Sequence, residues 1–407
     1  MSDDGTGAPE VALELVPRMN RQGYTRPQID KRRTWLETKT GVELHHVGAM
    51  TLPPESLRGN IENPIGSVQM PLGVAGPLLV NGQHAQGTFY VPFATTEGAL
   101  VRSYERGMVT LSRAGGVTTR ILRDENRVSP TFVFADVGKA HEFARELPSR
   151  FEALRAEAAS TTSHGRLLRI ECHPIGREVI VSFGFFTGDA HGMNMVVKAT
   201  ARACAWLMEH SQAERYYLFS GLESEKKASS HLLPGGKGKH VVAGARLSAA
   251  LLRTHLHVEP ARFADLWHRT MLGSLHAGTV GYNGHFANGL TAIFIALGQD
   301  VANVVNAAMG ITSLEVLDDG DFYASVTLPS LTVATVGGGT ALGTSRECLE
   351  TLGCYGKGKA AKLAEIVAAS LLAGELSIGA AIASGEFVAA HEQYGRNRPE
   401  PGPSPSS

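Results

Sequence analysis

The sequence contains few cysteines, and their arrangement excludes several classes of site. Only four are present among 407 residues, at Cys172, Cys204, Cys348 and Cys354. None belongs to a CxxC pair, and no group of histidines has the spacing of zinc ligands. We therefore expect free thiols, a reducing cytoplasmic environment and no metal site.

The sequence also lacks an excess of charge of one sign. Lys and Arg number 38 and Asp and Glu number 39, so the formal net charge is −1. Proteins that bind nucleic acid through its phosphates usually carry a basic surface, so no nucleic-acid partner is expected. Two short basic clusters, at 235–240 and 355–362, are each most simply solvated loops, and we favour that interpretation for the second.

Long apolar runs are missing as well. No uninterrupted stretch of about 18 apolar residues occurs, so no membrane-spanning segment is predicted. The acidic beginning of the chain, MSDDGTGAPE, lacks the apolar centre of a secretory signal. Hydrophobic residues make up 43% of the sequence and charged residues 19%, the balance of a folded globular protein with a large core. We expect a soluble enzyme of about two domains.

The middle of the chain has a different texture from its flanks. Residues 139–158 alternate apolar and charged positions as a surface helix does, with an interruption at Pro148. Residues 166–186 have the pattern of two strands, and a helix is predicted from about 192 to 209. These elements predict a compact α+β unit between about 120 and 219.

The flanking stretches 263–308 and 362–391 are apolar and rich in small residues, and both are predicted to be helical. Gly374, Gly379 and Gly385 are possible breaks in the second stretch. Small residues let helices approach closely, so both stretches are most simply buried core.

One sequence pattern imitates a phosphate-binding loop. GCYGKGK at 353–359 fits the spacing GxxxxGK, but Ala360 follows where a magnesium-binding hydroxyl would stand. No apolar strand leads into it. We therefore predict a surface loop and not a nucleotide triphosphatase.

A second pattern, GDAHGMNM at 188–195, follows a predicted strand and opens a predicted helix. Asp189 can cap that helix, and Gly192 would let a ligand approach the backbone. Free N–H groups at a helix start suit a pyrophosphate. An ordinary strand-to-helix turn explains the pattern equally well, and without a GxGxxG fingerprint any dinucleotide site here is not of the usual doubly wound kind.

Four polar residues stand out because they lie in apolar or small-residue settings. Glu97 begins the helix-like run EGALVRSYERG, and Lys226 lies in SEKKASS. Asp300 ends the apolar run AIFIALGQD, and His391 ends the last apolar helix. Taken singly, each is most simply a surface, capping or ion-pairing residue.

Taken together, these segments resemble the catalytic portion of the 3-hydroxy-3-methylglutaryl-coenzyme A reductase family over about 61–391. The resemblance rests on long strings that occur in the same order. They are ENPIG (62–66), PLGVAGPL (71–78), PFATTEGALV (92–101), GDAHGMNM (188–195), EKK (225–227), GKGKHVV (236–242), GYNGHFANGLTAIFIALGQD (281–300), LPSLTVATVGGGT (328–340) and AGELS (373–377).

The resemblance implies an α+β fold of unusual architecture. A large, mostly helical acyl-CoA-binding domain would comprise 61–119 and 220–394, and a smaller ferredoxin-like α+β domain at 120–219 would be inserted into it to bind the nicotinamide cofactor. Residues 1–60 would form an N-terminal helical segment. From composition, residues 1 to about 10 and the Pro- and Ser-rich tail 395–407 are expected to be mobile. The resemblance also implies a homodimer or homotetramer whose active site, with ENPIG, lies at the subunit interface.

The activity implied is the four-electron reduction of 3-hydroxy-3-methylglutaryl-CoA to mevalonate and free CoA with two NADPH. By the same resemblance, the catalytic residues are Glu97, Lys226, Asp300 and His391. Lys226 would stabilise the oxyanion, with Asp300 keeping it charged, and His391 would protonate the departing thiolate. Glu97 would be a buried acid that protonates the aldehyde.

The resemblance also assigns binding residues. The cofactor-binding candidates are Asp189, His191, Gly192, Met193, Asn194 and Arg166. The candidates for the substrate are Arg127, Ser220 and Lys227 at its carboxylate end and Asn288 within the catalytic cluster.

Three positions differ from the usual family pattern. Glu225 replaces an Asp, His191 replaces a Met, and TTSHGR at 161–166 replaces the Ser-Arg pair that holds the 2′-phosphate. NADPH is the cofactor that the resemblance implies and is the prediction. Because the pair that holds the 2′-phosphate is not matched, NADH stays an open alternative. A reductase of this fold acting on another acyl-CoA also stays open. A non-catalytic CoA-binding protein is disfavoured because all four catalytic residue types are present.

Overall fold

The computed structural model describes residues 14–18, 23–162 and 164–388. The chain divides into two compact units, residues 1–70 and 71–407. The stretches expected to be mobile, 1–10 and 395–407, lie outside the described residues, as does His391.

The first unit, which extends to Met70, is helical. Its elements are α1 (Arg26–Thr40), α2 (His45–Gly48) and the 3-10 turn η1 (Pro54–Leu57). Arg32 is buried and donates hydrogen bonds to the carbonyl oxygens of Gly23 (2.8 Å) and Pro64 (3.3 Å). This guanidinium therefore links the segment before α1 to the loop after η1.

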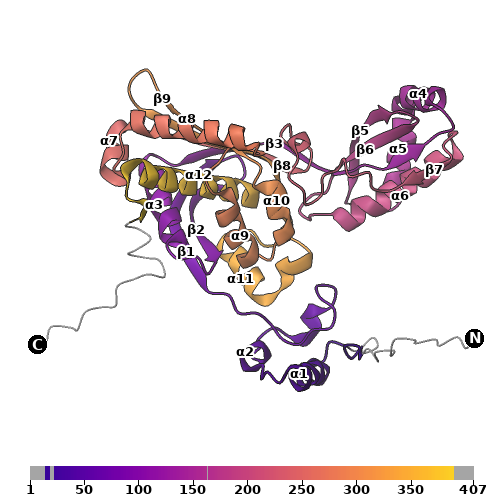
Figure 1. The fold of residues 1–407 in the computed structure, drawn as a ribbon, viewed down its shortest axis with the longest axis horizontal. Coiled ribbons are helices and arrows are strands. Elements are labelled where there is room, and N and C mark those ends of the chain that lie inside the picture. The colour runs from indigo at the N-terminus through magenta and orange to yellow at the C-terminus, as the bar shows by residue number, and fades with distance from the viewer. Residues whose placement is uncertain (1–13, 19–22, 163, 389–407) are drawn as a thin grey trace, which may run out of the picture. The chain divides into compact units, whose positions relative to one another are not determined.

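The second unit contains a mixed sheet that runs through both of its parts (Figure 1). The strands of the larger part are β1 (Leu72–Gly82), β2 (Gln86–Ala94), β3 (Val117–Val128), β8 (Gly238–Leu247), β9 (Ile311–Val316) and β10 (Phe322–Leu331). Their order is β2-β1-β3-β8-β10-β9, and every pairing is antiparallel except β1 with β3.

Strand β3 joins the larger part to the smaller one. Its residues 118–125 pair with β8, while 126–128 pair with β6 (Glu178–Phe186). The smaller sheet adds β4 (Thr131–Val133), β5 (Arg166–Ile175) and β7 (Arg215–Tyr217). The two strands expected over 166–186 are thus β5 and β6.

The helices of the smaller part lie where the sequence predicts them. They are α4 (Val137–Glu146), α5 (Phe151–Ala159) and α6 (Met193–Glu209). Pro148 lies in the 3-10 turn η2 (Leu147–Arg150) that separates α4 from α5, because proline cannot continue the α-helical hydrogen bonding. Phe132, Phe183 and Leu207 belong to a hydrophobic core that contains no residue of the larger part.

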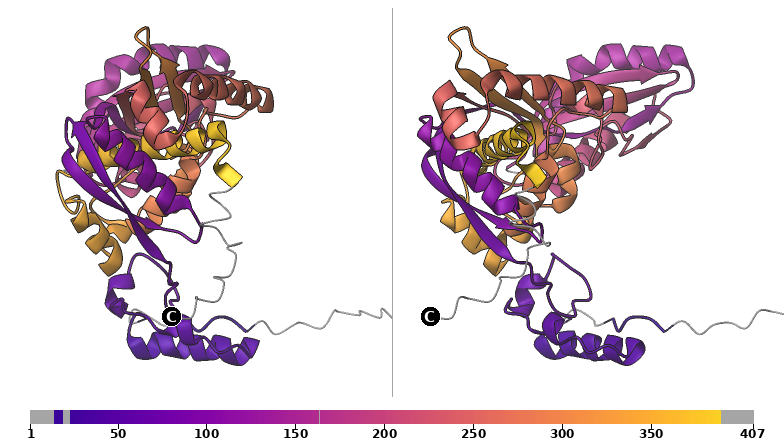
Figure 2. Two further views of the ribbon diagram at one scale, coloured as in Figure 1. Left: turned by 90° about the vertical axis from the view of Figure 1, so that its left-hand side faces the viewer. Right: turned by 60° about the vertical axis from the view of Figure 1, so that its left-hand side comes forward.

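The larger part is built around α12 (Ala360–Ser384), which contacts strands β3, β8 and β10 and helices α3, α8 and α9 (Figures 1 and 2). Its other elements are α3 (Leu100–Arg113), η3 (Ser230–Leu232), α7 (Ala249–Leu251), η4 (Leu252–Leu256), α8 (Pro260–Ala277), α9 (Phe286–Ala296), η5 (Val301–Asn303), α10 (Val304–Ala307), η6 (Gly338–Ala341) and α11 (Gly343–Thr351). The flanking stretches predicted to be helical core are therefore largely α8, α9 and α12.

Among the described residues, α12 is the one helix long and apolar enough to cross a membrane, but 83% of its most apolar window is buried inside the protein. It is therefore a core helix. The predicted breaks at Gly374 and Gly379 are wrong, because both residues lie inside the helix. They make room for neighbouring aromatic rings, those of Tyr104 and Phe263. Gly385 does end α12, with a φ of 83°.

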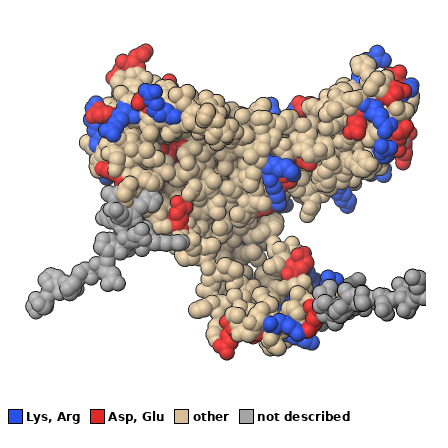
Figure 3. Space-filling model, in the orientation of Figure 1, with Lys and Arg blue, Asp and Glu red and all other residues tan. Residues whose placement is uncertain are grey.

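The fold class is mixed α and β, as expected. All four cysteines are free thiols. In the described part of the chain, no three His, Cys, Asp or Glu side chains are placed to share a metal ion. On the face shown in Figure 3, basic and acidic side chains are interspersed, with no continuous basic region.

Candidate active site

Lys226 is carried on a strained turn. The φ angles of Ser224 (51°) and Lys226 (55°) are both in the left-handed region, which costs side-chain-bearing residues free energy. The buried Asn306, on α10, holds this turn with three hydrogen bonds. Its amide nitrogen donates to the carbonyl oxygens of Ser224 (2.9 Å) and Lys227 (2.8 Å), and its oxygen accepts from Lys226 N (2.8 Å). A strained backbone fixed in this way is typical of a functional position.

The structure brings Lys226 and Asp300 together. The Lys226 ammonium lies 2.8 Å from Asp300 Oδ2, and both side chains are a little over one-third exposed. Asp300 precedes η5 and accepts hydrogen bonds from Ala302 N (3.2 Å) and the Asn303 amide (3.1 Å). These donors orient the carboxylate, so the ion pair has a defined geometry.

Glu97 pairs with Asn288. The Asn288 amide donates to both carboxylate oxygens of Glu97 at 3.0 Å. Two expectations for Glu97 are wrong in this chain. It does not begin a helix, because Ala99 adopts a φ of 69° and α3 starts only at Leu100. It is also exposed and not buried, because the turn leaves it at the mouth of a cavity.

That cavity has a volume of about 610 Å³ and lies between α3, the first turn of α9 and the end of α12. Arg102, Arg106 and His255 supply basic groups to its wall, and Leu100 and Ile378 supply apolar surface. Arg106 donates to the Ser377 hydroxyl at 3.0 Å and to the Ser377 carbonyl oxygen. Burial lowers the pKa of Arg106 from its ordinary value. Glu105 and Glu386 also line the cavity and pair with Arg102 and Arg106. The cavity can therefore receive a ligand with charged and apolar portions.

A buried carboxylate anchors the wall of this cavity. Glu375, in the middle of α12, accepts hydrogen bonds from Gly284 N (2.7 Å), His285 N (2.8 Å), His285 Nδ1 (3.2 Å) and the Thr312 hydroxyl (2.7 Å). Burial alone raises the pKa of Glu375, but these hydrogen bonds outweigh it, so the pKa lies below its ordinary value. Glu375 is therefore an anion that fixes the turn before α9.

The sequence predicts that Asp189 caps α6, and this prediction is wrong. Its carboxylate accepts hydrogen bonds from the backbone N–H groups of Gly358 (2.7 Å), Lys359 (3.0 Å) and Ala360 (3.0 Å), at the start of α12. The residue before α6 is instead Gly192, with a φ of 76°. The segment 188–192 therefore packs on the loop 353–359, which is otherwise exposed at its lysines, as predicted.

His191 lies in a cluster of charged groups. Its Nε2 is 3.9 Å from Glu225 Oε1, and the other oxygen of Glu225 forms an ion pair with the fully buried Lys237. The Lys237 ammonium also lies 3.5 Å from Met193 Sδ. Burial lowers the pKa of His191 and of Lys237, with Glu225 acting against the shift in both. The basic cluster at 235–240 is thus not a solvated loop, because its lysines are buried.

Arg127 is buried beside β6. Its guanidinium lies 2.5 Å from His231 Nε2 and 4.0 Å from the buried Glu125. Burial lowers its pKa, and Glu125 acts against that shift. Glu125 is also held by Arg169, in two hydrogen bonds of 2.8 Å. Nearby on β8, Lys239 pairs with Asp124 at 3.0 Å.

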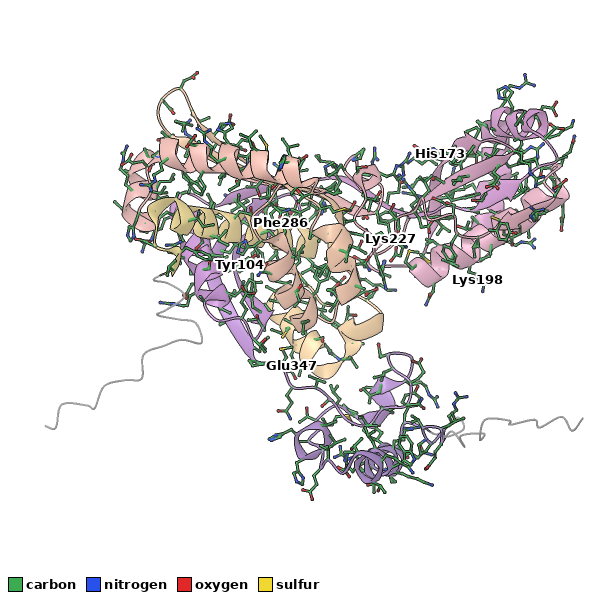
Figure 4. All side chains as sticks on the ribbon, viewed as in Figure 1. Tyr104, His173, Lys198, Lys227, Phe286 and Glu347 are labelled. Atoms are coloured by element: carbon green, nitrogen blue, oxygen red, sulfur yellow. The ribbon has the colours of Figure 1, made fainter. Side chains whose placement is uncertain are left out.

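The remaining candidates lie on the surface of the second unit. Arg166 stands over the ring of Phe186, with 5.6 Å between the guanidinium carbon and the ring centre. Asn194 is exposed in the first turn of α6. The Ser220 hydroxyl accepts from Leu222 N (3.2 Å), and the ammonium of Lys227, labelled in Figure 4, donates to the Glu225 carbonyl oxygen (3.3 Å).

Several residues that shape the site escaped sequence reasoning. Asn306 and His285 gave no local signal, because their roles come from contacts with distant segments. Glu375 did carry a signal that could have been used, since a lone acid inside an apolar helix must be paired. Lys237 lies in a string that resembles the family, but the short basic cluster around it favours a solvated loop.

Comparisons with known proteins place this geometry in a family context. The sequence model of the hydroxymethylglutaryl-coenzyme A reductase family matches residues 28–396. The 3-hydroxy-3-methylglutaryl-coenzyme A reductase of Methanocaldococcus jannaschii is 43% identical over 378 residues, which cover 90% of this chain and 92% of that protein. The enzyme of the same name from Aeropyrum pernix is 44% identical over 375 residues, with coverage of 90% and 89%.

The fold resembles a more distant solved structure. It is described as the class II 3-hydroxy-3-methylglutaryl-CoA reductase from Streptococcus pneumoniae bound to NADPH in open conformations. The TM-score is 0.65 at 19% identity, with 89% of this chain and 100% of that chain covered. At that identity the likeness concerns the arrangement of the backbone.

Proposed function

The chain belongs to the hydroxymethylglutaryl-coenzyme A reductase family, and on that premise we propose that it reduces 3-hydroxy-3-methylglutaryl-CoA to mevalonate and free CoA with two NADPH. The observation that carries the proposal is the Lys226–Asp300 ion pair on a strained turn held by Asn306. The reduced nicotinamide, when bound, supplies the hydride.

Lys226 stabilises the charge that hydride addition builds on the thioester oxygen. A preorganised cation is more effective than water because it needs no reorganisation when the charge develops. Asp300, at 2.8 Å, holds the ammonium in place. Removing such an electrostatic group typically lowers kcat by about 100- to 1,000-fold.

His391 protonates the CoA thiolate as the hemithioacetal collapses. Ordinary thiols have a pKa of about 8.5, so a proton delivered to sulfur favours its departure. His391 lies outside the described residues, but Glu386 and Phe387, just beyond α12, line the 610 Å³ cavity. The described chain therefore reaches this cavity four residues before His391.

Glu97 supplies the proton for reduction of the aldehyde. The Asn288 amide contacts both of its oxygens and orients the carboxyl towards the cavity. A carboxyl acts as an acid near neutral pH when burial or a neighbouring negative charge raises its pKa. Since Glu97 is exposed in this chain, bound substrate or a second copy of the chain would have to cover it.

The cavity fits the CoA portion of the substrate. Arg102, Arg106 and His255 can meet phosphate groups, and the apolar surface of Leu100 and Ile378 can cover the pantetheine arm. Arg127, Ser220 and Lys227 are proposed to meet the carboxylate end of the acyl group. The buried cations Lys237 and Lys239, each paired with an acid, are further candidates for that end.

The cofactor is proposed to bind along 189–194 at the start of α6, within the smaller part of the second unit. Gly192 has a positive φ and presents backbone without a side chain, as close approach of a phosphate requires. His191, Met193 and Asn194 border this segment, and Arg166 is proposed to hold the 2′-phosphate of NADPH. Asp189 would hold this segment in place and not contact the cofactor, because its carboxylate accepts hydrogen bonds from the backbone N–H groups at the start of α12.

The finer architecture is also a proposal. The separate core of the smaller part supports its assignment, at 120–219, as an inserted cofactor domain of ferredoxin-like type, with 61–119 and 220–394 forming the acyl-CoA-binding domain. A homodimer or homotetramer with the site at the subunit interface is supported by exposed apolar residues around ENPIG. Ile61 is 47% exposed and Val68 86% exposed. A cytoplasmic location is proposed from the free thiols.

The test is loss of NADPH absorbance when the purified protein meets 3-hydroxy-3-methylglutaryl-CoA, with mevalonate and free CoA identified as products. The Glu97→Gln variant should bind both ligands but lose roughly 100- to 10,000-fold in kcat, the range of a missing general acid. Its near-normal turnover would contradict the role of Glu97. Parallel assays with NADH and with other acyl-CoA thioesters decide the remaining alternatives, and no oxidation above background with either cofactor would refute the proposal.

A further inference from the structure

Tyr104 is fully buried, and its hydroxyl has no hydrogen-bond partner among the described residues. It projects from α3 into the larger part of the second unit (Figure 4). Buried hydroxyl groups nearly always have a partner, because losing water without replacement is unfavourable. An unpartnered one is therefore a feature to explain.

The fold makes specific room for this side chain. A Cβ atom on Gly289, in α9, would overlap the Tyr104 hydroxyl, and one on Gly374, in α12, would overlap its ring. Glycine inside a helix is unfavourable relative to alanine, so both helices give up stability to admit the tyrosine. Phenylalanine would fill the ring position equally well, which leaves the hydroxyl itself unexplained by packing.

The groups around the hydroxyl connect it to the candidate active site. The Tyr104 ring packs against Phe93 and His285, with ring centres 4.8 and 5.3 Å apart. The Nε2 atom of His285 is also buried and unpartnered in the described part of the chain, while its Nδ1 is 3.2 Å from Glu375. Burial raises the pKa of Tyr104, and the negative charges of Glu375 and Glu97 raise it further. Tyr104 is therefore a neutral donor close to both acids.

His285 contacts the Tyr104 ring and is connected to Glu97 through hydrogen bonds of Asn288. Its carbonyl oxygen accepts a hydrogen bond from Asn288 N at 3.1 Å, in the first turn of α9. The Asn288 side chain in turn donates to both oxygens of Glu97. A contact that holds the His285 imidazole and backbone in place therefore also holds the Asn288 side-chain amide, which orients the Glu97 carboxyl.

We propose that Tyr104 is a positioning residue for Glu97 that acts through His285 and Asn288. When the cavity is filled, the Tyr104 hydroxyl donates to His285 Nε2, while Nδ1 donates to Glu375. The imidazole is then held at both nitrogens, and the first turn of α9 holds Asn288 against Glu97 for proton delivery. This inference rests on the proposed function, because Glu97 is assigned as the acid of that reaction.

The experiment compares wild-type enzyme with Tyr104→Phe, which removes only the hydroxyl oxygen. Thermal stability, the Kd of NADPH, and kcat as a function of pH are measured for both. Stability should be unchanged or higher, since a buried unpartnered hydroxyl is lost. The Kd should be unchanged, while kcat falls about tenfold, as misplacement of a catalytic group predicts, and its pH profile changes shape. Tyr323→Phe, at a part-exposed position on β10, is the control and should match the wild type.

A double-mutant cycle with His285→Gln tests the route. If Tyr104 acts through His285, the double variant should be no slower than His285→Gln alone, because the two changes break one chain. Unchanged kcat and pH profile in Tyr104→Phe would overturn the inference, as would independent, multiplying losses in the cycle. Loss of activity that merely follows a loss of folded protein would overturn it too. A wild type without turnover would instead refute the proposed function, and this inference with it.

Discussion

At the scale of single residues, the site depends on side chains that hold other side chains. The proposed role of Lys226 requires its turn to keep Ser224 and Lys226 at positive φ, and that conformation is unfavourable without support from other residues. Asn306 supplies the support from α10 with three hydrogen bonds, all to the backbone of 224–227. An amide suits this task because it donates and accepts at once.

Replacement of Asn306 by Ala should therefore damage both folding and catalysis. Three backbone groups, of Ser224, Lys226 and Lys227, would lose their partner, at a cost of about 3 kcal/mol in the free energy of unfolding. The turn would relax and move the Lys226 ammonium away from Asp300, and a displacement of about 1 Å can lower kcat roughly 100-fold. The measurement is kcat per mole of folded enzyme, with unfolding followed in urea. Reduced stability with normal kcat would show that Asn306 supports only the fold.

At the scale of elements, α12 organises the larger part of the second unit. Its first residues receive Asp189, its middle carries Glu375, and the residues just beyond its end line the cavity. One rigid helix thus touches the proposed cofactor segment, the turn before α9 and the proposed CoA cavity. A rigid element holds such groups more accurately than loops can.

The packing of α12 against α3 can be tested with two glycines. Gly374→Ala would place a Cβ against the buried Tyr104 ring, whereas Gly273→Ala, on the exposed face of α8, meets nothing within 4 Å. Alanine is the better helix former, so Gly273→Ala should stabilise the protein by about 0.5–1 kcal/mol. Gly374→Ala should destabilise it by about 1–3 kcal/mol, the usual cost of overpacking. Thermal melts decide the signs, and a stabilising Gly374→Ala would show that α3 can shift freely.

The Glu375 clamp predicts a pH dependence of stability. The pKa of Glu375 is lower in the folded protein than its ordinary value of 4.5. The clamp therefore contributes its stability above the unfolded pKa, and that contribution is lost as pH falls through the lower, folded pKa. The wild type should be more stable than Glu375→Gln near neutral pH, and the gap should narrow in acid. Melting temperatures of both proteins from neutral to acid pH test this, and a constant gap would contradict it.

At the scale of the whole molecule, elements were easier to predict than contacts. The interruption at Pro148, the strands over 166–186 and the helix after Gly192 all follow from local rules about proline, alternation and helix starts. Gly374 was misread because glycine breaks helices locally, and only tertiary contact with Tyr104 explains its place inside one. The sequence strings identify the candidate residues, but they do not predict which groups hydrogen-bond to a given Asp.

Asp189 and Glu97 show why the rest could not be predicted. Asp189 follows the rule that an acid caps a helix, but the helix it caps begins at Ala360, 171 residues further along the chain. Glu97 was expected to be buried because the chemistry needs a dry acid. A single chain leaves it exposed, so its environment depends on what binds beside it. Both properties arise from the assembled molecule and not from neighbouring residues.

The proposed assembly makes a last prediction. Val68 is 86% exposed in the first unit, and Met70, two residues on, is 38% exposed. Apolar side chains clustered near ENPIG would be covered in a homodimer, where an unpaired charge would be buried at a high cost. Replacing both by Asp should weaken self-association by roughly 3 kcal/mol, about 100-fold in Kd.

The measurement is sedimentation of the double variant, with turnover assayed at the same protein concentrations. If Glu97 becomes a working acid only in the assembled site, turnover should fall in step with the fraction of dimer and recover at high protein concentration. Val137→Asp, at a 64% exposed position on α4, is the matched control and should leave both assembly and activity unchanged. A fully active monomer would show instead that bound substrate alone covers Glu97, and that one chain holds a complete site.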